Sequence, residues 1–174
     1  MKRILAGLGA ALLVAATPRA SAAEATRAGV RRDAVLERFV GQWRTETTVH
    51  DGAGARIAQT SGTGAGTRIL QDRWVEFRTA SVPPGEADLQ VMTWDERVGV
   101  YRQWVFDADG YWHVAEGRWD PATATLTWRG EKDGAAIVVT DRWLDADRLH
   151  WTLTRTAPDG RVLQRIEGTL TRTE

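Results

Sequence analysis

The chain has 174 residues, which is the usual size of a single domain. It contains no cysteine, so disulfides, thiolate nucleophiles and cysteine-based zinc sites are excluded, and the hydrophobic core alone must hold the fold. Its 23 basic and 23 acidic residues balance, which argues against nucleic acid as a partner.

The first 22 residues have the three-part pattern of a secretory signal peptide. Met1-Lys2-Arg3 is positively charged, residues 4–16 are apolar and small, and Ala20-Ser21-Ala22 has the small side chains that signal peptidase recognises. The segment is too short for a membrane anchor, so we expect cleavage after residue 22 or 23 and no membrane span in the mature protein. The exported chain, periplasmic or secreted, then begins with a flexible leader over 23–33. Loss of three basic residues leaves 20 basic against 23 acidic residues, a net charge of −3.

The next segment changes from helical to strand periodicity. Apolar residues recur at helical spacing over 34–40, where we expect a short helix. After Gly41 the period is two, and turn signals rich in Asp, Gly and Pro recur about every dozen residues, as in barrels and sandwiches. These signals predict ten strands, near 42–50, 55–69, 73–81, 88–94, 99–106, 111–119, 123–130, 135–144, 148–156 and 161–172.

Nearly all connections between these strands are short, so neighbouring strands are expected to be antiparallel. A meander with two open edges would invite aggregation, and closure into a barrel removes both edges. The sequence therefore predicts an all-β, up-and-down barrel of about ten strands over residues 34–174.

Loop lengths determine which side chains face the interior of the barrel. We expect four-residue loops over 107–110 and 120–123 and a three-residue loop over 145–147. The later strands then share one mostly apolar face, which we assign to the interior, while Trp94 and Trp112 point outward. The predicted interior face carries Val100, Arg102, Trp104, Phe106, Tyr111, His113, Ala115, Gly117, Trp119, Leu126, Trp128, Ile137, Val139, Asp141, Trp143, Leu149, Trp151, Leu153, Arg155, Val162, Gln164, Ile166, Gly168 and Leu170.

Two motifs resemble a known family. Phe39-Val40-Gly41-Gln42-Trp43 is a short helix running into Gly-x-Trp, the entry signature of lipocalin-like barrels, and we assign structural roles to Gly41 and Trp43. A second motif is similar to the central motif of the bacterial lipocalin-like family of domain of unknown function 1579; it comprises Trp94-Asp95, Tyr101, Trp104, Asp107 and Gly110. The resemblance covers residues 34–174. It implies a barrel with an internal cavity, and because the family has no established activity, it implies no catalytic residues.

Three charged residues on the predicted interior face, Arg102, Asp141 and Arg155, indicate a binding site. Buried charges need partners, and two arginines with one aspartate leave one positive charge for the carboxylate or phosphate of an amphipathic ligand. An internal salt-bridge network, or strand ends that reach solvent, explains the same residues equally well. The tryptophans of this face would line an apolar cavity or fill an ordinary core. The expected ligand-binding residues are Arg102, Trp104, His113, Trp128, Asp141, Trp151 and Arg155.

Three other functions fit the same sequence. His113 and Asp141 suit the acid and base of a cavity enzyme of isomerase or hydrolase type, and His113 suits a single axial ligand for haem. Outward Trp94 and Trp112 suit an interaction module with no ligand. We expect no metal site, because His113 and His150 point to opposite sides of the sheet. The favoured partner is a small hydrophobic or amphipathic molecule, bound without catalysis or a required cofactor; nothing in the sequence specifies an oligomeric state.

Overall fold

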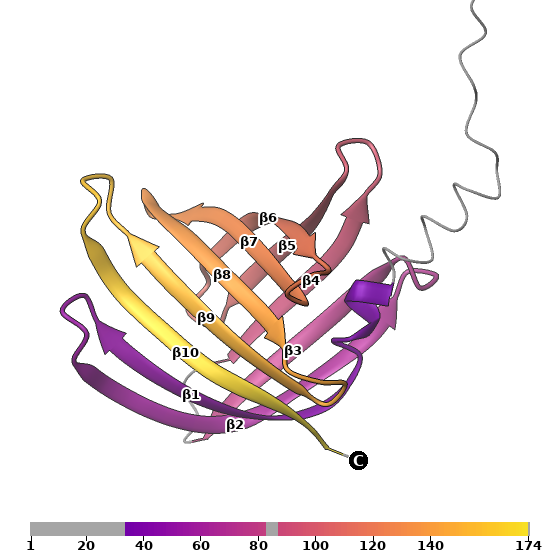
Figure 1. The fold of residues 1–174 in the computed structure, drawn as a ribbon, viewed down its shortest axis with the longest axis horizontal. Helices are drawn as coiled ribbons and strands as arrows, with labels where there is room; N and C mark the ends of the chain where they lie inside the picture. Colours follow the sequence, from indigo (N-terminus) through magenta and orange to yellow (C-terminus); the bar gives the residue numbers. More distant parts are fainter. Residues whose placement is uncertain (1–33, 83–86, 174) are drawn as a thin grey trace, which may run out of the picture.

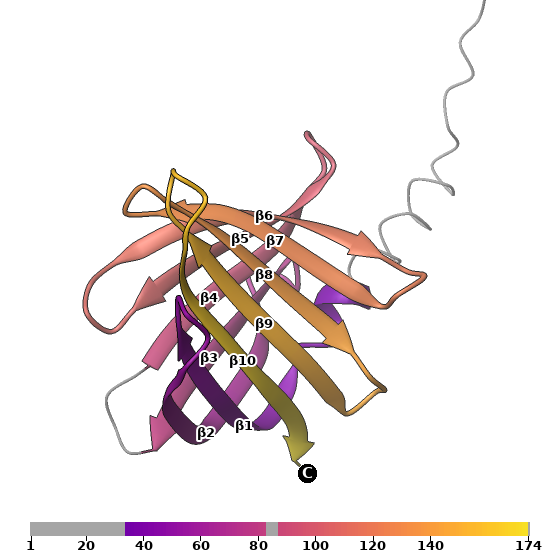
Figure 2. The same ribbon diagram turned by 60° about the vertical axis from the view of Figure 1, so that its left-hand side comes forward.

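The computed structural model describes residues 34–82 and 87–173. The predicted signal peptide (1–22), the leader (23–33) and the expected Pro83-Pro84-Gly85 turn lie outside the described residues. Ten antiparallel strands form a closed barrel in which each strand pairs with its neighbours along the chain and the first pairs with the last (Figures 1 and 2). The strands are β1 (Gly41–Asp51), β2 (Arg56–Ile69), β3 (Trp74–Val82), β4 (Ala87–Asp95), β5 (Val100–Asp107), β6 (Trp112–Asp120), β7 (Thr125–Lys132), β8 (Ala135–Trp143), β9 (Arg148–Thr156) and β10 (Val162–Thr173).

The predicted barrel is confirmed, and each predicted strand agrees with an observed one to within two residues at both ends. The agreement has a local cause, because aspartates hold the turns. Asp51 Oδ1 accepts hydrogen bonds from the backbone N–H groups of Ala53 and Ala55, both at 2.9 Å. Asp159 Oδ1 accepts one from the N–H of Arg161, also at 2.9 Å. Such side-chain bonds fix a turn by local chemistry, which the sequence displays directly.

One end of the barrel is closed by the segment predicted as a helix over 34–40. The segment forms a single helical turn followed by a bend, and it lies at one end of the strands (Figures 1 and 2). Val35, Leu36 and Phe39 are buried, and the ring of Phe39 meets that of Trp143 edge-on, with centroids 5.0 Å apart. The apolar side of the turn therefore plugs the barrel.

Gly41 and Trp43 join this helical turn to β1. The indole Nε1 of Trp43 donates a hydrogen bond to the carbonyl oxygen of Phe39 at 3.0 Å. The guanidinium of Arg172, from β10, lies 4.2 Å from the centre of the Trp43 ring. A Cβ atom at Gly41 would displace that guanidinium, and the φ of 125° at this residue is one that residues other than glycine rarely adopt, so the junction of the helical turn, β1 and β10 favours glycine.

Packing is uneven along the barrel. Inward-facing side chains farther from the helical turn, including Val139, Trp151, Leu153 and Ile166, are only partly buried. Because these side chains face inward and still contact solvent, the interior is not packed solid at their level, although Ala135 and Ile137, still farther from the helical turn, are buried. The largest fully buried side chains lie in the core that the turn covers: Trp43, Val75, Met92, Leu126, Trp128 and Leu149.

The hairpin between β5 and β6 differs from the prediction by one residue. Phe106 pairs with Trp112, and the N–H of Asp107 donates to the carbonyl oxygen of Tyr111 at 2.8 Å. The loop therefore has three residues rather than the expected four, and it ends at Gly110, whose φ is 89°. A glycine in the left-handed region at the third loop position closes this kind of hairpin. A shift of one residue turns every side chain of a strand to its other face.

The predicted facing of β5 is consequently wrong. Arg102 and Trp104 lie on the outer wall of the barrel, and Tyr101, Gln103 and Val105 are buried on the inner face.

One other facing prediction changes with this hairpin. Trp94 pairs with Tyr101 across β4 and β5 and faces inward, with the two ring centres 4.8 Å apart, so its predicted outward position is wrong. Tyr111, predicted inward, lies at the rim with 53% exposure, and the centre of its ring is 5.2 Å from Nζ of Lys132. Trp112 points outward as predicted and is 63% exposed. From β6 to β10 the inward and outward residues alternate as predicted, except at the start of β10, where a register irregularity pairs Val162, predicted inward, with the outward Thr156.

Candidate functional site

The lumen brings together most of the predicted ligand-binding residues. Arg102 and Trp104 are excluded from it by the facing of β5. The other residues of the set lie on the inner faces of β6 to β9: His113, Trp128, Asp141, Trp151 and Arg155.

Asp141 is a buried carboxyl in an apolar part of the lumen. It is 7% exposed, and its register partners are Leu126 and Trp151. The indole Nε1 of Trp128 donates to Asp141 Oδ2 at 2.7 Å. Burial raises the pKa of Asp141 to about 7, and the hydrogen bond from Trp128 only partly opposes that rise. Near neutral pH, a large fraction of Asp141 is therefore uncharged.

Arg155 lies farther from the helical turn than Asp141, and it faces the lumen between Ile137 and Gln164. Its Nη2 is 3.4 Å from Oδ2 of Asp133 in the β7–β8 turn, at the rim of the barrel. Its Nε is buried and has no hydrogen-bond partner in the part of the chain that the structure describes. The predicted network of two arginines and Asp141 is absent from the described residues, because Arg102 lies outside and Asp141 bonds Trp128 instead.

His113 faces the lumen from β6, at the level of Lys132 and Val105. Its Nδ1 is buried and lacks a hydrogen-bond partner among residues 34–82 and 87–173. Burial lowers the pKa of His113, and Lys132 adds to this effect while Asp107 opposes it. Lys132 is itself in an ion pair with Asp107. Burial therefore favours the neutral imidazole of His113.

The acid–base pair predicted for an enzyme is not assembled in this structure. Asp141 bonds Trp128, whereas the charged neighbours of His113 are Asp107 and Lys132. No group of three or more His, Cys, Asp or Glu side chains suited to a metal ion occurs among the described residues.

A chain of polar side chains on the opposite wall was missed by sequence reasoning. Gln103 Nε2 donates to Gln90 Oε1 at 2.7 Å, and Gln90 Nε2 donates to Asp88 Oδ1 at 3.2 Å. The N–H of Asp88 donates to Thr79 Oγ1 at 3.3 Å, and burial raises the pKa of Asp88. The missed signal was Gly110, because a three-residue loop there turns Gln103 inward.

The lumen therefore has two unlike walls. β4 lies opposite β9 in the ring of strands, so the polar chain faces the apolar wall of β8 to β10. That apolar wall carries Trp151, Leu153 and Ile166, with Arg155 nearer the rim. A ligand with one apolar part and one polar part would contact complementary surfaces here.

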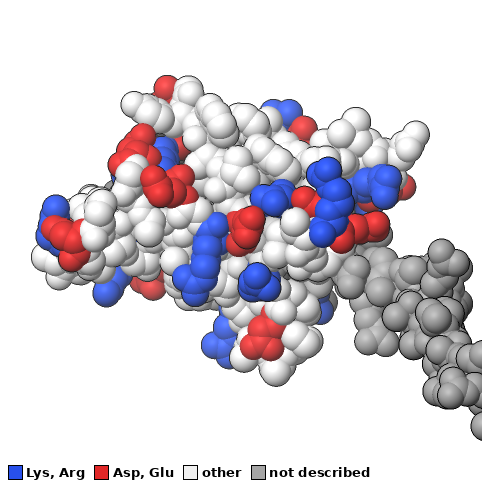
Figure 3. All heavy atoms as spheres, turned by 90° about the horizontal axis from the view of Figure 1, so that it is seen from above, with Lys and Arg blue, Asp and Glu red and all other residues white. Residues whose placement is uncertain are grey.

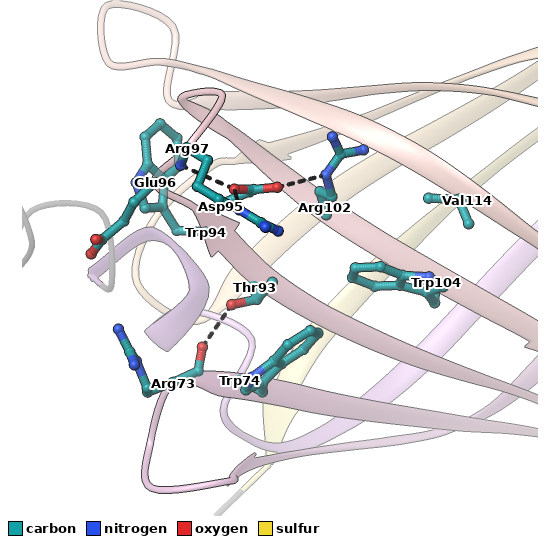
Figure 4. Close-up of a pocket in the computed structure, with 10 residues that line it drawn as sticks. All are labelled: Arg73, Trp74, Thr93, Trp94, Asp95, Glu96, Arg97, Arg102, Trp104 and Val114. Carbon is teal, nitrogen blue, oxygen red and sulfur yellow. Dashed lines mark hydrogen bonds and ion pairs between the residues drawn. The ribbon is translucent and has the colours of Figure 1, made fainter.

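Arg102 and Trp104 belong to a second feature, a hollow of about 720 Å³ on the outer wall (Figure 4). Arg102 is held there by two carboxylates: its Nε is 3.0 Å from Asp95 Oδ2, and its Nη1 is 3.2 Å from Glu116 Oε1. The hollow lies mainly on the face of the sheet away from the lumen, and at the end of β4 it also reaches Trp94, whose ring packs against the inward Tyr101.

The closed ten-stranded antiparallel barrel, covered at one end by a helical turn, defines a lipocalin-like, or calycin-like, protein. Its fold is similar to that of Rv2717c from M. tuberculosis, with a TM-score of 0.62 and 12% identity over 81% of this chain and 96% of that one. It is also similar to the S-type phycobiliprotein lyase CPES from Guillardia theta, with a TM-score of 0.58 and 16% identity over 82% and 92% of the two chains.

The chain belongs to the family described as Protein of unknown function (DUF1579), whose sequence profile matches residues 31–172. The predicted resemblance is thereby confirmed. No curated protein matches the chain. Among the described residues, no helix is long and apolar enough to cross a membrane.

Proposed function

We propose that this protein binds an amphipathic anion in its lumen, with the anionic group on Arg155 and the apolar part along β9 and β10. The observation that carries the proposal is that the inner wall has partly exposed apolar side chains next to an arginine. Trp151, Leu153 and Ile166 face inward and remain partly exposed, and beside them Arg155 has a buried Nε without a partner. The Arg155 side chain as a whole is 30% exposed, so part of it can reach a ligand. An apolar surface next to such a guanidinium is complementary to a carboxylate or phosphate with a hydrocarbon tail.

The charges of the lumen favour an anion over a cation. Asp107 is neutralised by Lys132, and burial raises the pKa values of Asp88 and Asp141, which disfavours their charged forms. Arg155 contributes a guanidinium to the lumen, and its ion-pair partner among the described residues, Asp133, is 3.4 Å away at the rim, where its side chain is 48% exposed. The fold neighbour that is a phycobiliprotein lyase adds support at the level of the fold alone.

Titration with three twelve-carbon probes tests the proposal. Laurate and dodecyl phosphate should bind more tightly than dodecanol, because only the first two offer an anion to Arg155. Tryptophan fluorescence reports binding, since Trp151 lies on the proposed wall. Arg155→Ala should weaken laurate binding by at least about tenfold, the usual effect of losing a hydrogen bond to a charged group.

Arg165→Ala is the matched control, because Arg165 is exposed on the outer face of the adjacent strand β10. Equal laurate affinity in the wild type and Arg155→Ala would reject the anchor. A Soret band on addition of haem, lost in His113→Ala, would support the haem alternative instead.

The proposed setting is outside the cytoplasm. It rests on the signal-peptide pattern of residues 1–22, with its charged start, apolar stretch and small residues before the cleavage site. Mass spectrometry of protein from the periplasm or medium of a bacterial host should find a mature chain beginning at Ala23 or Glu24. A chain that retains Met1 and stays with the cytoplasmic fraction would contradict export.

A further inference from the structure

The hollow on the outer wall has the composition of a second binding site. It lies over β3 to β6, on the side of the sheet away from the lumen (Figure 4). Its volume of about 720 Å³ is within the usual range for small-molecule sites. The outward side chains that line it are Trp74, Thr93, Asp95, Arg102, Trp104 and Val114.

Two indoles form the apolar part of the hollow. The rings of Trp74 and Trp104 lie side by side, with centroids 5.5 Å apart and planes tilted by 44° (Figure 4). Both side chains are only partly buried. Trp43 and Trp128, by contrast, are fully buried in the core. Because they face outward, Trp74 and Trp104 add little to the core, and their exposed surface is available to a partner.

Fixed hydrogen-bonding groups lie beside the indoles. Hydrogen bonding to Arg102 lowers the pKa of Asp95, so this carboxylate is charged and accepts hydrogen bonds. Arg102 is held by Asp95 on one side and Glu116 on the other, which fixes its guanidinium and offsets its charge. The hydroxyl of Thr93 donates a hydrogen bond to the carbonyl oxygen of Arg73 at 2.9 Å. The hollow thus offers a donor, an acceptor and a hydroxyl in set positions.

The charges around the hollow disfavour simple ions. A cation would lie close to the arginines at 73, 97 and 102, and an anion would lie close to Asp95 and Glu96. A complementary ligand is neutral, has one flat apolar face for the indoles, and carries groups that both donate and accept hydrogen bonds. A sugar ring has this combination, because its C–H groups form an apolar face and its hydroxyls donate and accept.

We propose that the outer-wall hollow is a carbohydrate-binding site, with Trp74 and Trp104 as the platform for a sugar ring and with Asp95 and Arg102 bonding its hydroxyls. The site is separate from the lumen, so each ligand is expected to bind whether or not the other is present.

The test is a binding screen followed by matched variants. The full mature protein is screened by affinity electrophoresis in gels that contain hydroxyethyl cellulose, dextran, starch, xylan or solubilised peptidoglycan. At least one of these should retard the wild type, and calorimetry with its oligosaccharide should give the affinity. Trp104→Ala should weaken that affinity at least about tenfold, which is 1.4 kcal/mol.

The controls separate this site from other surfaces. Trp112→Ala removes an exposed outward tryptophan that does not line the hollow, so it should leave glycan binding unchanged. Arg155→Ala should leave it unchanged as well, because Arg155 faces the lumen. Val114→Arg, which fills the hollow and spares the tryptophans, gives a second variant if Trp104→Ala folds poorly; circular dichroism checks each fold.

Two results would overturn the proposal. Retardation by none of the five polysaccharides would remove the ligand class. Glycan binding that survives both Trp104→Ala and Val114→Arg would place the sugar elsewhere on the molecule. Anilinonaphthalene sulfonate tests the nearest competing chemistry: an effect of Trp104→Ala on this aryl anion, without any glycan bound, would assign the hollow to aromatic anions.

Discussion

Asp141 is an ionisable group in the core whose side-chain hydrogen bond within the described part of the chain comes from a neutral partner, the indole of Trp128. Taking a carboxylate out of water costs free energy that one neutral hydrogen bond does not repay, so the folded protein favours the protonated form. The pKa of Asp141 accordingly rises from 3.8 to about 7. Any proton bound in this way links folding to pH.

The sign of this linkage is a testable prediction. Below pH 4 the folded and unfolded states both hold the proton, and Asp141 carries no penalty. Between pH 4 and 7 the unfolded chain releases the proton and the folded protein retains it, so the free energy of unfolding falls as pH rises. Above pH 7 the penalty reaches its limit of about 4 kcal/mol. Asp141→Asn removes the titration, and its stability relative to wild type should increase from pH 4 to 7 in urea denaturation.

Asp120→Asn is the control with the opposite sign. Asp120 accepts hydrogen bonds from Thr123 and the backbone of Ala122 in an exposed turn, and these bonds lower its pKa. Asp120→Asn should therefore cost stability at neutral pH and cost less as the pH falls through the lowered pKa. A difference between Asp141→Asn and wild type that stays constant over pH 4 to 7 would show that Asp141 does not titrate in this range.

The packing of β6 against β7 depends on a glycine, which leaves space for a large side chain on the neighbouring strand. Gly117 on β6 pairs with Trp128 on β7, and a Cβ at residue 117 would lie 2.6 Å from two ring atoms of the indole and 3.0 Å from Cβ of Tyr101. The glycine makes room for the largest buried side chain of β7, and the indole in turn reaches Asp141. A short residue on one strand and a large one on the next fill the interior without a void.

Gly117→Ala should destabilise the barrel by about 1–3 kcal/mol, because the extra methyl group over-packs a site whose neighbours are held in place. Urea denaturation followed by tryptophan fluorescence measures the effect. Arg118→Ala, at the next and outward position of β6, should change stability by less than about 0.5 kcal/mol. Equal stabilities of Gly117→Ala and wild type would mean that the Trp128 ring moves aside freely.

The hairpin at Gly110 shows how one residue decides the chemistry of a whole strand. Both a three-residue and a four-residue loop fit the sequence between β5 and β6, and each leaves a credible strand. With the three-residue loop, Gln103 and Val105 face the lumen, and Arg102 and Trp104, predicted to bind the ligand there, lie on the outer wall. The lumen consequently has a polar wall that the prediction did not include.

At the scale of the whole molecule, side-chain burial in the barrel differs between the end covered by the helical turn and the interior farther from it. The helical turn, Trp43 and Arg172 close one end, and the largest fully buried side chains lie in the core beneath it. The interior farther from the turn keeps apolar surface in contact with solvent. Charged side chains of both signs are interspersed over the face seen in Figure 3. The two surfaces proposed to bind ligands, the lumen and the outer hollow, lie on opposite faces of the sheet.

The sequence by itself determined the number of strands, their bounds to within two residues, the closed antiparallel order and the helical turn that precedes β1. Each of these depends on local signals, namely turn aspartates, glycines and the change of period after Gly41. Which side chains of a strand face inward depends on the length of the loop before it, and a change of one residue in that length turns the whole strand over. From β6 onward the expected parity holds, so His113, Trp128, Asp141, Trp151 and Arg155 share the lumen as predicted. Only the tertiary structure decided that Arg102 and Trp104 lie outside, which depends on the length of the loop at Gly110. It also decided that Asp141 is paired with an indole rather than an arginine, which depends on how the side chains of β7 and β8 pack against each other.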